Sequence, residues 1–101
     1  MMKKVRHFKT LLDINKNEFL SIIERAVELK KLQTNNEYPD TLRKKIMAMI
    51  FKKNSTRTRI SLESSMSKLG GHAIYLSSDS SQLSRGESLA DTAKVLSGIV
   101  D

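Results

Sequence analysis

The sequence predicts an α/β domain with three layers, in which a parallel sheet is flanked by helices. Two short apolar segments, 46–51 and 73–76, are typical of strands, and amphipathic segments precede, separate and follow them. The resulting order, helix, strand, helix, strand, helix, is the one that crossover connections produce in a parallel sheet. Because two strands are few for a stable sheet, we expect the chain to be unfinished or to pair with a partner.

The first helix is expected to begin at Asn15, after an irregular lead-in over residues 1–14. The Asn15 side chain can accept from free backbone N–H groups, and Glu18, three residues later, can close a capping box. A polar break over 34–40, which contains the only proline, ends the helix. Apolar side chains at helical spacing predict one buried stripe, made of Phe19, Ile22, Ile23, Ala26 and Leu29 or Leu32.

The middle of the chain predicts a strand, a helix and a second strand. Residues 46–51 form a continuous apolar run bounded by lysines, which is typical of a strand buried on both faces. Segment 55–69 carries apolar residues at helical spacing, namely Leu62, Met66 and Leu69. Gly70 and Gly71 follow, where glycine accepts the left-handed conformation that ends a helix. Residues 73–76 are the second expected strand.

The last part of the chain predicts a polar loop and a third helix. Residues 77–88 contain six serines in twelve positions, which favours a flexible loop. Apolar residues at 89, 93 and 96 then indicate a helix. Ser88 and Asp91 have the spacing of a capping pair at its start.

Composition excludes several classes of protein. With 101 residues, 39% hydrophobic and 29% charged, the chain fits one small globular domain rather than a disordered segment. The absence of cysteine excludes disulfides and thiolate metal sites and fits a reducing cytoplasm. The two histidines and scattered carboxylates lack metal-ligand spacing, so no metal is expected. No apolar run approaches the ~18 residues of a membrane span or follows the basic start, so neither a membrane partner nor secretion is expected.

The net charge of +7 favours anionic partners, which include nucleic acid, a membrane surface or a small phosphate. The basic residues are spread over the first sixty positions, aromatic residues make up only 5%, and there is no tryptophan. A platform for stacking nucleic-acid bases is therefore poorly supported. A small basic nucleic-acid-binding module nevertheless stays open as an alternative at this point.

The segment most indicative of function lies where the first strand gives way to the second helix. Ligands of open α/β sheets bind outside the carboxyl ends of the strands, and a helix N-terminus offers free N–H groups and partial positive charge. Ser55, Thr56 and Thr58 add hydroxyl groups, and Arg57 adds a planar fork that can contact two oxygens. These groups predict a cradle for a phosphate dianion. The alternative is a serine-capped helix with exposed arginines.

Arg57 and Arg59 are expected to have different roles. Because successive helical residues turn by about 100°, the two side chains point to nearly opposite sides. Arg59 has Glu63 four residues further on, a spacing typical of a surface ion pair. We therefore expect Arg57 to face the ligand and Arg59 to be structural. His72 is expected to be a structural or surface residue rather than a base.

Three ordered motifs resemble the aspartate/ornithine carbamoyltransferase family, and the resemblance covers roughly residues 5 to 101. The motifs are Ser55-Thr56-Arg57-Thr58-Arg59 followed by Ile60-Ser61-Leu62-Glu63, then Leu69-Gly70-Gly71-His72-Ala73, then Gly86-Glu87-Ser88-Leu89-Ala90-Asp91-Thr92-Ala93. Such a resemblance implies that residues 1–101 are the incomplete N-terminal, carbamoyl-phosphate-binding domain of a two-domain carbamoyltransferase. The ornithine-binding domain would be absent from this chain.

The resemblance also implies a reaction and a site. Ser55, Thr56, Arg57 and Thr58 would bind carbamoyl phosphate, with Arg57 and Thr58 acting in catalysis, and Gln82 would reach into a neighbouring subunit's site. The implied reaction transfers the carbamoyl group to the side-chain amine of ornithine, giving citrulline and phosphate in arginine biosynthesis. Family members need no metal or organic cofactor and are usually built on trimers. A homotrimeric, cytoplasmic enzyme is therefore expected.

The loop before the third motif favours the ornithine branch over the aspartate branch. The aspartate branch carries a lysine before Gly-Glu-Ser, whereas this chain has Arg85 there, preceded by Gln82 and Leu83. An aspartate carbamoyltransferase relative stays the alternative. Two small departures from the family pattern, Leu62 in place of Phe and Gly98 in place of Arg, affect packing or surface more than ligand chemistry.

Overall fold

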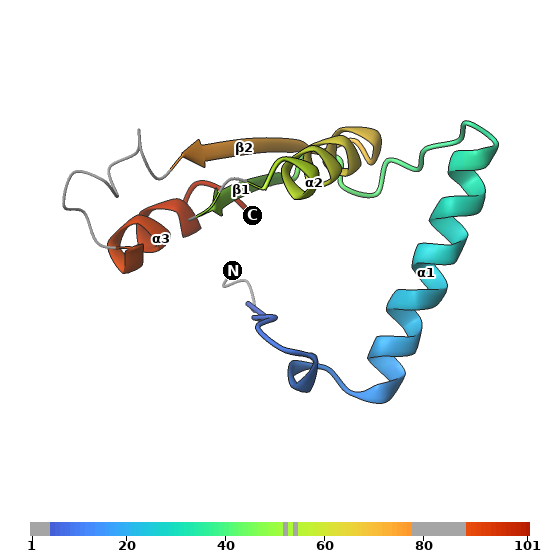
Figure 1. The fold of residues 1–101 in the computed structure, drawn as a ribbon, viewed down its shortest axis with the longest axis horizontal. Coiled ribbons are helices and arrows are strands. Elements are labelled where there is room, and N and C mark those ends of the chain that lie inside the picture. The colour runs from blue at the N-terminus through green and yellow to red at the C-terminus, as the bar shows by residue number, and fades with distance from the viewer. Residues whose placement is uncertain (1–4, 52, 54, 78–88) are drawn as a thin grey trace. The chain divides into compact units, whose positions relative to one another are not determined.

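The computed structural model describes residues 5–51, 53, 55–77 and 89–101 (Figure 1). The chain divides into two compact units, Met1–Tyr38 and Pro39–Asp101. The second unit has the predicted order of strand, helix, strand and helix, with a parallel sheet, which confirms the α/β class. None of the described helices is both long and apolar enough to cross a membrane.

In the first unit a short 3-10 helix, η1 (Leu11–Asp13), interrupts the lead-in that the sequence suggested would be irregular. Thr10 is its N-cap, and the Thr10 hydroxyl accepts from the backbone N–H of Leu12 at 3.1 Å. The Asp13 carboxylate accepts from the N–H groups of Thr10 and Lys9, and these bonds lower its pKa below the ordinary value. The Thr10-x-x-Asp13 spacing is the signal that could have predicted this turn.

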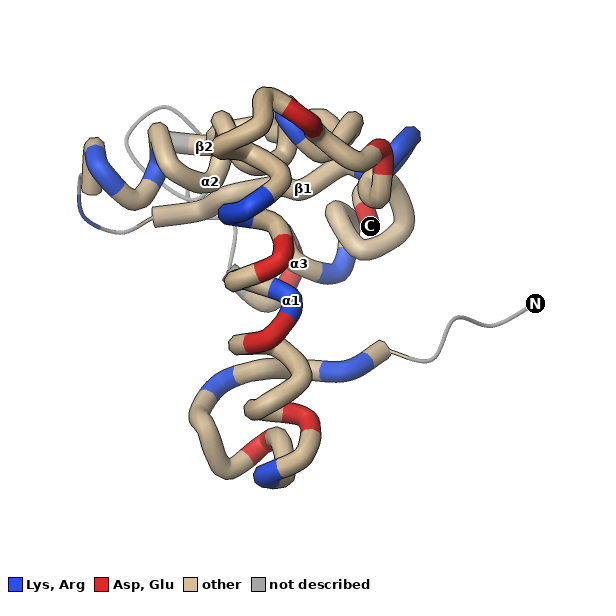
Figure 2. The backbone as a smooth tube through the Cα atoms, turned by 90° about the vertical axis from the view of Figure 1, so that its right-hand side faces the viewer, with Lys and Arg blue, Asp and Glu red and all other residues tan. Residues whose placement is uncertain are grey.

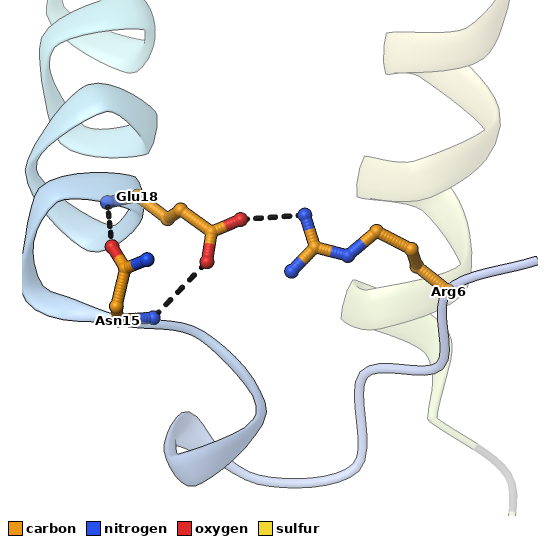
Figure 3. Close-up of polar contacts among 3 residues, drawn as sticks. All are labelled: Arg6, Asn15 and Glu18. Carbon is orange, nitrogen blue, oxygen red and sulfur yellow. Dashed lines mark hydrogen bonds and ion pairs between the residues drawn. The ribbon is translucent and has the colours of Figure 1, made fainter.

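Helix α1 (Lys16–Thr34) begins with the predicted capping box (Figure 3). The Asn15 side-chain oxygen accepts from the backbone N–H of Glu18 at 2.8 Å, and the Glu18 carboxylate accepts from that of Asn15 at 3.2 Å. The other Glu18 oxygen accepts from Arg6 at 2.5 Å, so the ion pair links the lead-in to the helix start. This ion pair, with the bond from the Asn15 backbone, holds the pKa of Glu18 below its ordinary value.

The predicted buried stripe of α1 is wrong for this structure, because no residue of the helix is buried. Phe19, Ile22 and Ile23 are 40%, 53% and 47% exposed. Both signs of charge follow one another along the same helix (Figure 2). The helical spacing correctly predicted an amphipathic helix, but burial requires a second packed surface, which the other described residues of this unit do not supply.

The sheet of the second unit consists of two parallel strands, β1 (Ile46–Phe51) and β2 (His72–Ser77). Their register pairs Ile46 with His72 and Phe51 with Ser77. Helix α2 (Thr56–Lys68) connects the strands and packs on β2, and α3 (Leu89–Ser97) follows in the chain (Figure 1). The predicted capping residue of α3, at position 88, and the loop before it lie outside the described residues.

Burial in this unit is limited. Met49 of β1 and Met66 of α2 are the buried hydrophobic residues of the described part, at 3% and 8% exposure. The other β1 residues are only half-buried, so the prediction of a strand buried on both faces is wrong for most of β1. A two-stranded sheet packed mainly against one helix has too few neighbours to cover both faces of a strand.

The connection from α2 to β2 confirms the predicted glycine stop. The N–H of Gly71 donates to the carbonyl of Met66 at 2.7 Å, and the N–H of Gly70 donates to that of Ser67 at 3.2 Å, the two bonds of a Schellman motif. Gly70 has a φ of +87°, in the left-handed region that glycine adopts without strain. The turn therefore leads directly from α2 into β2.

Asp101 closes the unit against the start of β1. Its N–H donates to the Ile46 carbonyl at 3.0 Å, and its carboxylate accepts from the Ile46 N–H, also at 3.0 Å. The Lys45 ammonium lies 3.7 Å from the same carboxylate. Residues 55 positions apart in the sequence thus fix the beginning of the strand that leads to the candidate site.

Candidate functional site

The candidate site lies where β1 ends at Phe51 and α2 begins at Thr56, with Ser55 as the N-cap residue. The Ser55 hydroxyl makes no capping bond to the helix and instead donates to the Thr58 hydroxyl at 2.9 Å. The first helical bond runs from the Arg59 N–H to the Ser55 carbonyl, at 2.9 Å. Two of the predicted ligand residues, Ser55 and Thr58, are therefore in direct contact.

Helix α2 begins without a side-chain cap, whereas η1 and α1 each begin with one. At η1 and α1 a side-chain oxygen accepts from a first-turn N–H, and an acidic residue lies in the first turn. The first turn of α2 has neither, and it carries Arg57 and Arg59 instead. Because the first N–H groups of a helix have no intrahelical acceptor, this turn combines free donors with positive charge. That combination is suited to binding an anion.

An open pocket of about 350 Å³ lies beside this turn. Two of the predicted ligand residues, Ser55 and Thr56, line the pocket, whereas Arg57 and Thr58 do not. Gln82 lies outside the described residues. The remaining lining comes from the end of β1, from α2 and from β2, and consists of Phe51, Arg59, Ile60, Glu63 and Tyr75.

The opposite orientation of the two arginines follows from helix geometry and agrees with these contacts. Arg59 points toward the pocket and forms the predicted ion pair, with its Nε atom 2.9 Å from a Glu63 oxygen. Arg57 is exposed and makes no ion pair with a described residue. Its guanidinium is therefore not committed to another side chain in the described part of the chain.

Tyr75 is the neighbour of the candidate site that sequence reasoning missed. The Arg59 guanidinium carbon lies 3.7 Å from the centre of the Tyr75 ring, in a cation–π contact. The Tyr75 ring in turn packs against Phe51, with ring centres 5.9 Å apart and planes inclined at 60°. No local spacing could have predicted the pair, because Tyr75 lies on β2 and reaches α2 only through the strand register.

The described residues contain no group of three or more histidine, cysteine, aspartate or glutamate side chains that could hold a metal ion. His72 is exposed at the start of β2, in agreement with its expected surface role. The polar groups at the start of α2 are hydroxyl groups, backbone N–H groups and guanidinium groups. Groups of these kinds can bind and orient an oxyanion and stabilise charge on it.

Comparison with known proteins gives the family. Residues 6–101 match the family model described as aspartate/ornithine carbamoyltransferase, carbamoyl-P binding domain. The chain belongs to this family. Ornithine carbamoyltransferase of Hydrogenovibrio crunogenus is 52% identical over 97 residues, which are 96% of this chain and 32% of that protein. The chain thus spans about a third of the length of this carbamoyltransferase relative.

Solved carbamoyltransferase structures share the fold. Anabolic ornithine carbamoyltransferase from Campylobacter jejuni superposes with a TM-score of 0.83 at 49% identity, over 96% of this chain and 31% of that one. The catalytic subunit of aspartate transcarbamoylase from M. jannaschii has the same TM-score at 38% identity, over 96% of this chain and 32% of that one. Both branches of the carbamoyltransferase family therefore share this α/β arrangement, as the sequence motifs predicted.

Proposed function

We propose that this chain supplies the carbamoyl phosphate site of an ornithine carbamoyltransferase. The observation that carries the proposal is the first turn of α2, which follows a strand end, lacks a side-chain cap and presents hydroxyl and guanidinium groups. The matching family region is described as a carbamoyl-P binding domain, which supports the ligand. Ser55, Thr56, Arg57 and Thr58 are the proposed ligand residues, and Gln82 joins them on the basis of the sequence.

In the proposed mechanism the chain binds and orients carbamoyl phosphate without a covalent enzyme intermediate. The phosphate lies at the N-terminus of α2, where the free N–H groups and Arg57 stabilise the charge that builds as phosphate leaves. Thr58 donates a hydrogen bond to the carbonyl oxygen, which becomes the oxyanion of the tetrahedral intermediate. The neutral side-chain amine of ornithine attacks the carbamoyl carbon, the bond from that carbon to the phosphate oxygen breaks, and the departing phosphate accepts the proton that the amine nitrogen loses. Holding the reactants in position lowers the barrier. No cofactor takes part in this mechanism.

Ornithine is proposed over aspartate as the acceptor. Among solved structures, ornithine carbamoyltransferases are 37–49% identical to the chain and aspartate transcarbamoylases 25–39%, and curated relatives named ornithine carbamoyltransferase reach 52%. Gln82 and Arg85 of the loop sequence support the same choice. Since the chain matches only about a third of each relative, we place the ornithine contacts in the remaining two thirds of the enzyme. A homotrimer in the cytoplasm, working in arginine biosynthesis, completes the proposal.

A chimeric enzyme tests this function directly. The corresponding 97 residues of the Hydrogenovibrio crunogenus enzyme are replaced by this chain, which is 52% identical to them. The chimera is supplied with carbamoyl phosphate and either ornithine or aspartate, and the carbamoylated product is identified by mass spectrometry. We expect citrulline from ornithine, because the host supplies the ornithine contacts and this chain supplies the carbamoyl phosphate site; aspartate serves as the negative control.

The matched control for the chimera carries Arg57→Gln in the same background. A folded chimera that forms no citrulline, or that forms it equally well with Arg57→Gln, would contradict the proposed site. Transfer to aspartate by a second chimera, built on the M. jannaschii aspartate enzyme, together with failure of the first would favour the aspartate alternative.

A further inference from the structure

We propose that Arg59 is a positioning residue, which holds the first turn of α2 in a fixed place on β2 and thereby orients the phosphate cradle. This inference rests on the proposed function, because it assigns a second role at the same site. It differs from the ligand set above, since Arg59 acts through the helix and not through contact with substrate. It also goes beyond an ordinary surface ion pair, since a ring on a neighbouring strand takes part.

Arg59 is joined to the site at its backbone and to the sheet at its side chain. Its N–H donates to the carbonyl of Ser55 and closes the first turn of α2. Its guanidinium lies over Tyr75, with the central carbon 3.7 Å from the ring centre. One residue therefore connects the N-cap of the cradle to the middle of β2.

Two contacts restrain the guanidinium. The Glu63 carboxylate accepts from Nε at 2.9 Å, while the Tyr75 ring contacts the guanidinium face. Glu63 lies one turn further along α2, which makes it part of the same rigid helix. A planar group with one contact on α2 and another on β2 is suited to holding the first turn of α2 in place on the strand.

Tyr75 is itself well anchored. In the strand register it pairs with Met49, which at 3% exposure is the most buried hydrophobic residue of the described part. Its ring also packs against Phe51, the last residue of β1 before the cradle. The stack on Tyr75 therefore ties the helix start to the best-packed point of the sheet.

The two arginines have different roles at this turn. The Arg59 Nε atom donates to the Glu63 carboxylate, and the guanidinium lies over the Tyr75 ring, so Arg59 is held by two partners on α2 and β2. Arg57 makes no ion pair with a described residue and turns to the other side of the helix. The charge that meets the ligand is thus supplied by Arg57, and the orientation of the turn by Arg59.

The test measures affinity for inorganic phosphate and for carbamoyl phosphate by titration calorimetry on the 101-residue chain, at a temperature at which each variant is folded by circular dichroism. Arg59→Gln and Tyr75→Leu should each weaken binding by about 3- to 10-fold. Combining them should weaken binding no further than the stronger single change, because both remove the same contact. Tyr75→Phe, which keeps the ring, should restore affinity.

Arg43→Gln is the matched control. It removes the same charge from the same unit and breaks only a 3.9 Å pair with Asp40, so phosphate affinity should be unchanged. Arg59→Lys keeps the charge but lacks the planar fork, and should bind with intermediate affinity. This variant also provides a test should Arg59→Gln fail to fold.

Three results would overturn the inference. Lowered melting temperatures with unchanged affinity would make Arg59 merely structural, and full affinity with Arg59→Lys would make its charge alone sufficient. Weakened binding with Arg59→Gln but not with Tyr75→Leu would make Arg59 a direct ligand. In the chimera, Arg59→Gln should raise KM for carbamoyl phosphate. An unaltered chimera without activity would instead refute the proposed function, so the two failures are distinguishable.

Discussion

Replacing Arg57 with glutamine should weaken carbamoyl phosphate binding while leaving the fold intact. Arg57 is exposed at the start of α2, and it makes no ion pair with a described residue. Its removal therefore breaks no ion pair with a described residue, and the free energy of unfolding should change by less than about 0.5 kcal/mol. Any loss of affinity then reports on the ligand and not on the protein.

The expected loss follows from the contact that Arg57 would make. A hydrogen bond to a charged group contributes about 1.5–3 kcal/mol, which corresponds to a loss of about 10- to 150-fold in affinity. The free N–H groups of the uncapped turn, together with the Ser55 and Thr58 hydroxyls, are unaffected by the change, so some binding should survive. Titration calorimetry of the chain with carbamoyl phosphate measures both quantities.

Arg43→Gln serves as the control here too, since it lowers the net charge equally without touching α2. If Arg57→Gln and Arg43→Gln bound carbamoyl phosphate equally well, Arg57 would contribute only general positive charge. Unchanged affinity in both would refute the reasoning that places the phosphate on the Arg57 side of this turn.

Three further predictions concern stability. Gly71→Ala should destabilise the second unit by about 1–3 kcal/mol in urea unfolding, because the new Cβ would lie 3.0 Å from a backbone carbonyl oxygen, whereas Gly98→Ala, with 3.7 Å available, should be nearly neutral. Met49→Ala should cost about 2–5 kcal/mol by the same assay, since Met49 is 3% exposed. The lowered pKa of Glu18 means that its contribution to α1 is present above the ordinary carboxyl pKa of 4.5 and is lost as pH falls through the lower folded value. Helical content by circular dichroism should therefore fall in that acidic range, and Glu18→Gln should flatten the dependence, whereas an unchanged acid transition would assign it elsewhere.

Local patterns predicted most of the backbone because each rests on contacts within a few residues. Asn15 and Glu18 are three positions apart, and their two bonds depend on little beyond the helix start itself. Gly70 likewise ends α2 through bonds to the preceding turn. The apolar run 46–51 was predicted with the bounds that β1 has in the structure, since the continuous run and its flanking lysines are also local.

Burial and side-chain partners were decided by the tertiary structure. The apolar face of α1 was visible in the sequence, but a face becomes a core only where another surface packs on it, and no residue of α1 is buried. Arg59 illustrates the same limit at the site. Its partner four residues away was predictable from helix geometry, whereas Tyr75, sixteen residues away on another element, was not.

The sequence by itself determined the family motifs and the helix and strand positions, and it supplied the proposed set of phosphate-binding groups, because these depend on residue type and short spacing. Only the tertiary structure decided that Arg59 lies over Tyr75 and that the first turn of α2 lacks a side-chain cap. Both follow from how one strand registers against another and from which of several possible hydrogen bonds a hydroxyl makes. Those choices depend on atoms brought together by folding, and no local spacing encodes them.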